Sequence, residues 1–239
     1  MEKKNLIFAS ASFHPWNRNK LKFKKKDFVS REHFYWVCLE QLLRVVPKNF
    51  EIYIVENTIK SLEDLYSEKL ISCLNKFNIM FLPKNYKTHS PNIGVSELNQ
   101  LFYLNDQINF EKYNNICYFS SRRFITNPYV FEKTLNLKKN ALISNPDFIY
   151  LNGKVLESEK KGMFNDMFFS MKSKTMQEYI LFSKKRIDYL EKNMINSESN
   201  LYDFINEFKV PYEELPNLGF LRYDYYSKSK NENEKYHFV

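Results

Sequence analysis

The order of apolar and amphipathic segments in the first 130 residues constrains the fold most. Short apolar runs predict four strands, at 5–12, 50–58, 78–83 and 115–119. Amphipathic segments between them predict three helices, at 31–46, 61–77 and 95–108. Because strands joined through helices pair in parallel, the alternation predicts an α/β protein with a mostly parallel, twisted sheet flanked by helices.

The remaining residues mix β-structure with helices. We expect a hairpin over 141–158 that turns near Asn152-Gly153, followed by a strand at 164–172. Helices are predicted at 127–136, 175–193 and 198–208. We expect a single domain over 1–239 with two halves and a polar tail, at 1–135, 136–225 and 226–239.

Composition excludes several classes of protein. The chain has only 4 glycines and carries neither GxGxxG nor GxxxxGK[ST], which excludes glycine-rich phosphate loops. Its 3 cysteines are far apart in apolar segments, which predicts buried free thiols in a reducing cytoplasm. No apolar stretch predicts a signal peptide or a membrane-spanning helix. The net charge of +8 is compatible with nucleic acid, an anionic membrane surface or an anionic small substrate.

The fourth predicted strand ends in an unusual polar cluster. The apolar run NICYF is followed directly by Ser120-Ser121-Arg122-Arg123, and a helix is predicted to begin after Asn127-Pro128. In α/β proteins the carboxyl ends of parallel strands hold the ligand. This cluster is therefore a candidate site, and it offers two guanidinium groups and no carboxylate.

A series of motifs resembles the GT-A glycosyltransferases, and family-2-like members in particular. The first strand ends in small polar residues, the second ends in Glu56, and 92-NIGVSELNQL-101 follows. Asn92, Gly94 and Asn99 match the N-x-G-x-x-x-x-N element that this family carries before its metal-binding strand. The resemblance covers about residues 5–135, and it implies a GT-A-like fold with a β/helical acceptor-side region after it.

This chain departs from the family at the end of the fourth strand. The family has D-x-D there, which holds a divalent cation against the nucleotide diphosphate, whereas this chain has Ser120 to Arg123. Since hard cations prefer carboxylate oxygens, the departure implies a metal-independent enzyme with no cofactor. Arginines can instead stabilise a diphosphate through bidentate hydrogen bonds. A solvated strand end, or an ion pair with a helix carboxylate, is the alternative for both arginines.

The resemblance implies further contacts to the nucleotide sugar. The implied binding residues are Ser10, Ser12, Glu56, Asn92, Gly94, Ser121, Arg122 and Arg123. Glu56 would accept hydrogen bonds from the ribose or the base, and Gly94 would permit a close backbone approach. The alternatives are that Glu56 caps the next helix and that the two serines after the first strand serve turn geometry.

Inverting members of the family use a carboxylate to deprotonate the acceptor hydroxyl. Glu198, at the start of a predicted helix, is the first candidate for this base, and Asp166 is the second. A glutamate in the first turn of a helix is equally explained by its interaction with the helix dipole. No two histidines have metal-ligand spacing, so no zinc site is predicted.

The first hypothesis is a glycosyltransferase that moves a sugar from a nucleotide-sugar donor to a surface-polysaccharide or lipid-linked glycan acceptor. Its basic segments at 20–26 and 172–186 would hold it at the inner face of an anionic membrane, unless they are simply solvated lysine faces. One alternative is a catalytically inactive glycosyltransferase-like module. The other is a nucleic-acid-binding protein, although its aromatic residues fall at core positions and no nucleic-acid-binding motif accompanies them.

Overall fold

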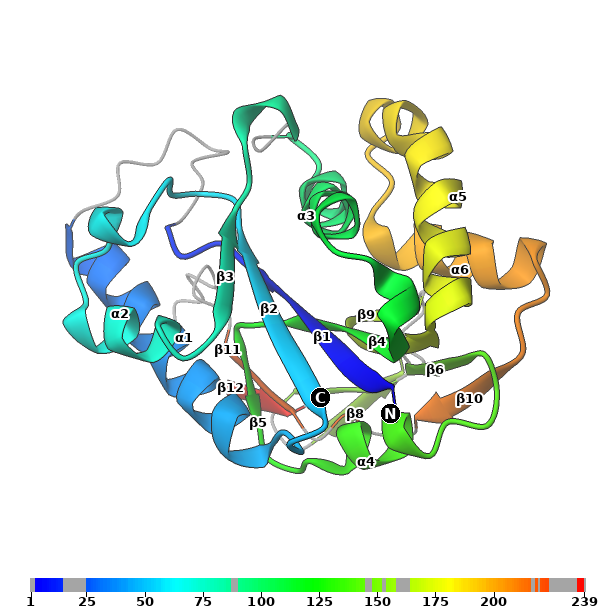
Figure 1. Cartoon of the computed structure of the whole chain (residues 1–239), viewed down its shortest axis with the longest axis horizontal. Helices are drawn as coiled ribbons and strands as arrows, with labels where there is room; N and C mark the ends of the chain where they lie inside the picture. The colour runs from blue at the N-terminus through cyan, green and yellow to red at the C-terminus, as the bar shows by residue number, and fades with distance from the viewer. Residues whose placement is uncertain are drawn as a thin grey trace.

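A computed structural model gives the arrangement of most of the chain (Figure 1). It describes residues 3–14, 25–86, 90–144, 148–151, 154–157, 164–215, 218, 220–223 and 236–238. The strands are β1 Lys4–Ala11, β2 Phe50–Glu56, β3 Asn78–Phe81, β4 Tyr113–Ser120, β5 Arg123–Ile125, β6 Ala141–Ser144, β7 Phe148–Leu151, β8 Lys154–Glu157, β9 Asn165–Lys172, β10 Tyr212–Leu215, β11 Phe220–Tyr223 and β12 Tyr236–Phe238. The helices are α1 Lys25–Val45, α2 Glu68–Leu74, α3 Ile93–Gln107, α4 Tyr129–Leu135, α5 Ser173–Lys192 and α6 Ser197–Glu207, and short 3-10 turns lie at Leu62–Asp64, Lys84–Tyr86 and Phe110–Lys112.

The main sheet has seven strands in the order β10-β6-β9-β4-β1-β2-β3. Strands β3, β2, β1 and β4 are parallel, as are β10 and β6, whereas β9 runs antiparallel to both of its neighbours. The predicted α/β class with a mostly parallel sheet is confirmed. The parallel strands therefore end at one edge of the sheet, where the sequence reaches its polar clusters.

Helices cover both faces of this sheet, with α3, α5 and α6 on one side and α1, α2 and α4 on the other (Figure 1). Each side has its own apolar cluster, so strand β1 is buried on both faces from Asn5 to Ala11. This explains why β1 reads as a continuous apolar run and does not alternate.

Two predicted helices differ from the observed ones in their extent. Helix α1 begins at Lys25 and not after Ser30. Lys25 and Lys26 are good helix formers, and Asp27 interacts favourably with the helix dipole in the first turn. The helix predicted over 61–77 is interrupted, leaving a 3-10 turn at Leu62–Asp64 and helix α2. The interruption has a tertiary cause: buried Glu32 accepts hydrogen bonds from the backbone amides of Tyr66 and Ser67, which a continuous helix would use internally.

The predicted hairpin is present as the antiparallel pair β7–β8, while its turn at Asn152-Gly153 lies outside the described residues. The preceding segment, strand β6, joins the main sheet. A separate three-stranded sheet, in the order β12-β11-β5, was not predicted, and its strand β12 lies in the segment expected to be a polar tail. Each of its strands has three or four residues, too few to give a periodic signal.

The expectation of buried free thiols is confirmed. Cys38, Cys73 and Cys117 are buried free thiols. Among the described residues, no helix is both long enough and apolar enough to cross a membrane.

Candidate functional site

The carboxyl ends of β1, β2 and β4 meet at one edge of the sheet. Ser10 pairs with Val55 of β2 on one side and with Ser120 of β4 on the other. Beyond β4, the backbone amide and hydroxyl of Ser121 both donate to the carbonyl of Ser10. The expected convergence of these strand ends is therefore present, and we call it the strand-end edge: residues 10–14, 56–58 and 120–122.

Helix α3 fixes two of these strand ends from one face. The side-chain amide of Gln100 is buried and donates to the carbonyl of Ala11 at 2.7 Å and to that of Val55 at 2.8 Å. Gln100 thereby joins the last residue of β1 to the next-to-last residue of β2. Sequence reasoning missed this role, because α3 contains several polar residues and nothing in their pattern distinguishes Gln100.

Glu56 is completely buried and its carboxylate is used by its own loop. It accepts hydrogen bonds from the amide and hydroxyl of Thr58, from the amide of Phe13 at 2.8 Å and from the amide of Ile59 at 3.2 Å. Burial raises the pKa of Glu56, while its hydrogen bonds with Thr58 and Phe13 oppose that rise. The carboxylate thus joins the loops after β1 and β2, and the predicted contact to ribose or base stays a prediction.

The two predicted serines after the first strand also have partners within the protein. The hydroxyl of Ser10 lies 2.9 Å from that of Tyr118, and Ser12 donates to Asn57 at 2.6 Å. A hydroxyl with one partner keeps further hydrogen-bonding capacity, so these contacts leave room for a ligand role.

The adjacent arginines Arg122 and Arg123 occupy different environments. Arg123 begins β5, is buried and pairs in register with β11, whereas Arg122 lies in the turn before it and is only partly buried. Burial raises the pKa of Cys38 to about 12, and the positive charges of Arg123 and Arg122 both oppose this rise. Arg122 therefore stands at the strand-end edge, and Arg123 is part of the structure beneath it.

A further cation at this edge comes from helix α1 and was missed by sequence reasoning. Arg31 is buried, donates through Nε to the carbonyl of Ser12 at 2.8 Å and lies 5.6 Å from the ring of Tyr35. Burial raises the pKa of Tyr35, and the charges of Arg31 and Arg122 both oppose this rise. Arg31 therefore binds the loop after β1, and Arg122 follows Ser121, which binds the end of β1. In the sequence, Arg31 looked like an ordinary polar residue of an amphipathic helix.

A second buried carboxylate supports the loop after β1. Glu32 accepts from the amide of Ser67 at 2.7 Å, and it lies 3.0 Å from Nε2 of His14. The ring of His14 is stacked on Tyr66 at a centroid distance of 5.9 Å. His14 therefore ties the end of β1 to the start of α2.

Asn92 and Gly94 lie where the amino ends of α3 and α6 meet, a contact that we call the α3–α6 joint. Asn92 caps α3 by accepting from the amide of Gly94 at 3.0 Å, and it donates to the carbonyls of Leu190 and Ile195. A side chain on Gly94 would bring its Cβ within 2.4 Å of the amide nitrogen of Ser197. The close approach expected at Gly94 is present, and its partner is the backbone of α6.

The two candidates for the base are placed differently. Glu198 lies in the first turn of α6, where it accepts from the side-chain amide of Asn196 at 2.9 Å. Asp166 is in β9, but its side chain lies outside the described residues. Another carboxylate, Glu97 of α3, faces this region and accepts from the hydroxyl of Ser197 at 3.3 Å. In the part of the chain that the structure describes, no cluster of three His, Cys, Asp or Glu side chains is arranged to hold a metal.

No family profile matches the sequence, and no curated relative matches it either. Solved structures do match the fold. One is a protein assigned as a nucleotide-diphospho-sugar transferase from Desulfovibrio desulfuricans G20, with a TM-score of 0.55 and 12% identity over 90% of this chain and 80% of that chain. Another is 4-diphosphocytidyl-2C-methyl-D-erythritol synthase from Anaerococcus prevotii DSM 20548, with a TM-score of 0.50 and 15% identity over 90% of this chain and 87% of that chain. The GT-A-like architecture is thereby confirmed as a fold shared with nucleotide-diphospho-sugar transferases.

Proposed function

We propose that this protein is a nucleotide-sugar-dependent glycosyltransferase that works without a divalent metal. The observation that carries the proposal is that two arginines stand at the strand-end edge: Arg31 donates to the carbonyl of Ser12, and Arg122 follows Ser121, whose amide donates to the carbonyl of Ser10. In a fold shared with nucleotide-diphospho-sugar transferases, this edge is where a nucleotide diphosphate would bind. Ser120 to Arg123 stand where the resembling glycosyltransferases carry D-x-D, so arginine would supply the positive charge.

In the proposed reaction an acceptor hydroxyl attacks the anomeric carbon of the donor sugar. The bond from that carbon to the diphosphate oxygen breaks, and its electron pair leaves with the nucleoside diphosphate. Arg122 would stabilise the developing charge by hydrogen bonds, and Arg31 would hold the loop at Ser12 in place. The hydroxyl proton would pass to a carboxylate, for which Glu198 and Asp166 are the candidates.

The remaining binding residues follow from this placement. Ser10, Ser12, Glu56 and Ser121 would surround the nucleotide, with residues 1–135 forming the donor half and 136–225 the acceptor half. Asn92 and Gly94 would act through the α3–α6 joint. The acceptor class would be a surface polysaccharide or a lipid-linked glycan. Lysines of α5 would place the enzyme at the inner face of the membrane.

Nucleotidyl transfer is a second candidate, and the match to the diphosphocytidyl-methylerythritol synthase favours it. The two reactions differ in the donor: a nucleotidyltransferase takes a nucleoside triphosphate and releases pyrophosphate. A glycosyltransferase takes a nucleotide sugar and releases a nucleoside diphosphate. Release of pyrophosphate from a triphosphate with a sugar phosphate would favour the second candidate.

Thermal shift against nucleotides, nucleotide sugars and oligonucleotides, with and without Mn²⁺, tests the proposal. We expect stabilisation by one nucleoside diphosphate and its sugars, independent of metal. Arg122→Ala should weaken this binding by about tenfold or more, as expected for a lost charge-assisted hydrogen bond. The matched variant Arg123→Ala should lower the melting temperature of the free protein. It should weaken nucleotide binding less than Arg122→Ala does. Stabilisation by oligonucleotides alone would overturn the proposal, and binding without transfer to any acceptor would indicate an inactive module.

A further inference from the structure

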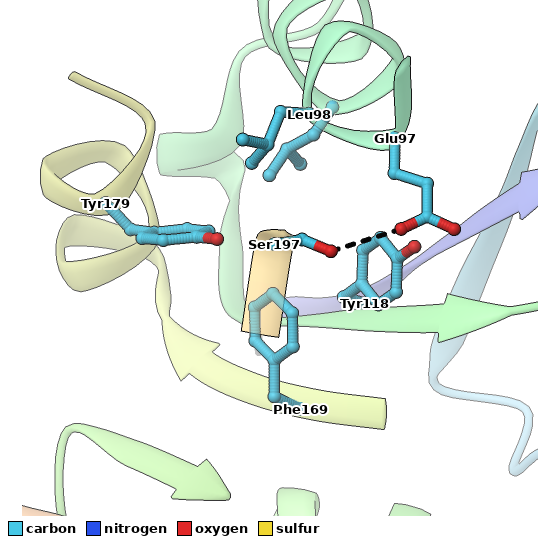
Figure 2. A pocket seen from close by; sticks show the side chains of 7 residues that line it. Glu97, Leu98, Tyr118, Phe169, Tyr179 and Ser197 are labelled. Atoms are coloured by element: carbon cyan, nitrogen blue, oxygen red, sulfur yellow. Dashed lines mark hydrogen bonds between the residues drawn. The ribbon is translucent and has the colours of Figure 1, made fainter. Parts of the chain in front are cut away.

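A small pocket lies beside the α3–α6 joint (Figure 2). The apolar side chains around it come from helices α3 and α5 and strands β4 and β9: Leu98, Leu101, Tyr118, Phe169 and Tyr179. The volume open to the centre of a water molecule is about 10 Å³, room for one water or one group of similar size. Its exposed surface is almost wholly apolar, so a water inside would lack the two to four polar partners that it needs.

The walls of the pocket are rigid aromatic rings. Tyr118 and Phe169 are stacked with centroids 5.1 Å apart and an angle of 5° between their planes. Phe169 meets Tyr179 edge-on at 5.8 Å. All three are buried, so the shape of the cavity is fixed by packing and does not depend on exposed, mobile side chains.

Two polar side chains stand beside this apolar space. Glu97 of α3 and Ser197 of α6 flank it, with the Ser197 hydroxyl donating to a Glu97 carboxylate oxygen at 3.3 Å (Figure 2). Glu97 is the most exposed of the lining residues, so the pocket opens on its side. The ionised carboxylate accepts hydrogen bonds only, and its oxygens can accept from a ligand in addition to Ser197, whose single O–H is already donated to it.

The pocket is connected to the strand-end edge. The hydroxyl of Tyr118 lies 2.9 Å from that of Ser10, the residue whose carbonyl also binds Ser121. Tyr118 therefore belongs both to the wall of the pocket and to the hydrogen-bond network of the strand-end edge. Asn92 and Gly94 clamp α3 against α6 and so fix the spacing between Glu97 and Ser197.

From this complementarity we infer that the pocket recognises the acetamido group of an N-acetylated amino sugar. Its methyl group would fill the apolar space, and its N–H, which lies on the same side of the amide as the methyl group, would donate to Glu97, while Ser197 holds that carboxylate in place. A plain hydroxyl sugar would leave the apolar space empty and make fewer contacts. The inference rests on the proposed function and specifies the substrate class of that site.

Matched ligand pairs test this inference directly. The probes are UDP-N-acetylglucosamine with UDP-glucose, and methyl N-acetylglucosaminide with methyl glucoside in the presence of whichever nucleoside diphosphate stabilises the protein. We expect about a tenfold or greater preference for the N-acetylated member, the effect of one buried methyl group and one net hydrogen bond. In saturation-transfer NMR, the acetyl methyl protons should receive the strongest saturation.

Two variants should remove the preference for different reasons. Leu101→Phe would fill the pocket, and Glu97→Ala would remove the acceptor at its opening while leaving the apolar wall intact. Glu207→Ala, at the exposed far end of α6, is the matched control and should keep the preference. Melting curves without ligand show whether each variant is folded. If Leu101→Phe does not fold, Glu97→Ala alone tests the assignment.

The outcomes separate the two proposals. Nucleotide sugars that bind equally well with and without the acetamido group would overturn the pocket assignment and leave the glycosyltransferase proposal standing. A preference that survives in Glu97→Ala would also overturn the assignment. If no nucleotide, nucleotide sugar or glycoside binds at all, both proposals fail together.

Discussion

The two sides of the strand-end edge are held together by different chemistry. On the α1 side, buried charged groups bind the backbone of the loops: Glu32, Glu56 and Arg31 all have partners there. On the α3 side, the uncharged amide of Gln100 binds the same edge, and α3 itself is held against α6 by the close backbone contact at Gly94.

This difference separates the charged groups that hold the loops from those that the proposal assigns to a ligand. A carboxylate that accepts four hydrogen bonds from the loops after β1 and β2, as Glu56 does, is stabilised by those donors and positions the chain. Partly exposed charged groups such as Arg122 and Glu97 are better placed for a ligand. Position at a strand end therefore selects the candidate residues, and their hydrogen bonds separate those that hold the loops from those that the proposal assigns to the ligand.

Removing a buried charge on the α1 side should have the largest effect. Glu56→Ala leaves the donors of Phe13 and Thr58 buried without their acceptor, so we expect a loss of about 3 to 5 kcal/mol in the free energy of unfolding. Urea unfolding followed by circular dichroism measures this loss. Glu63→Ala, at an exposed position in the neighbouring 3-10 turn, should change it by less than about 0.5 kcal/mol. Equal losses in the two variants would contradict a structural role for Glu56.

Crowding the α3 side should have a smaller effect. In Gly94→Ala the new methyl group meets the amide nitrogen of Ser197 at 2.4 Å, so the joint must open at a cost of about 1 to 3 kcal/mol. The same unfolding measurement applies, with Ile93→Ala as the control because that side chain is 54% exposed. An unchanged stability in Gly94→Ala would show that α6 moves freely against α3, and the comparison between the two sides would then fail.

The sequence predicted the fold well where elements are long and periodic. The strands at 50–58 and 115–119 and the helices at 175–193 and 198–208 are all present, because burial on one or both faces leaves a clear pattern. The three-stranded sheet of β5, β11 and β12 was missed, since its short strands are paired only through contacts between segments far apart in the chain.

The candidate site was predicted only in part, for a similar reason. Strand ends are visible in a sequence, so the edge formed by Ser10, Glu56 and Ser121 could be anticipated. Arg31 and Glu97 belong to helices whose pattern gives no sign of what they face across the fold. Their roles depend on how α1 and α3 pack, which periodicity alone does not specify.

The smallest effect is expected for the thiols, which report how tightly the α1 side is closed. Burial raises the pKa of Cys38, Cys73 and Cys117 to about 12. At pH 8, well below these values, each thiol stays protonated and inaccessible, so native protein should react with a thiol-specific disulfide reagent only through local opening. In denaturant all three should react at once, because an exposed thiol has a pKa near 8.5.

Glu56→Ala should accelerate labelling of the native protein, whereas Gly94→Ala, which perturbs the opposite layer, should leave the rate nearly unchanged. Equal acceleration in both variants would mean that the two layers open together, and the different chemistry of the two sides would then not divide the fold into separately stable parts.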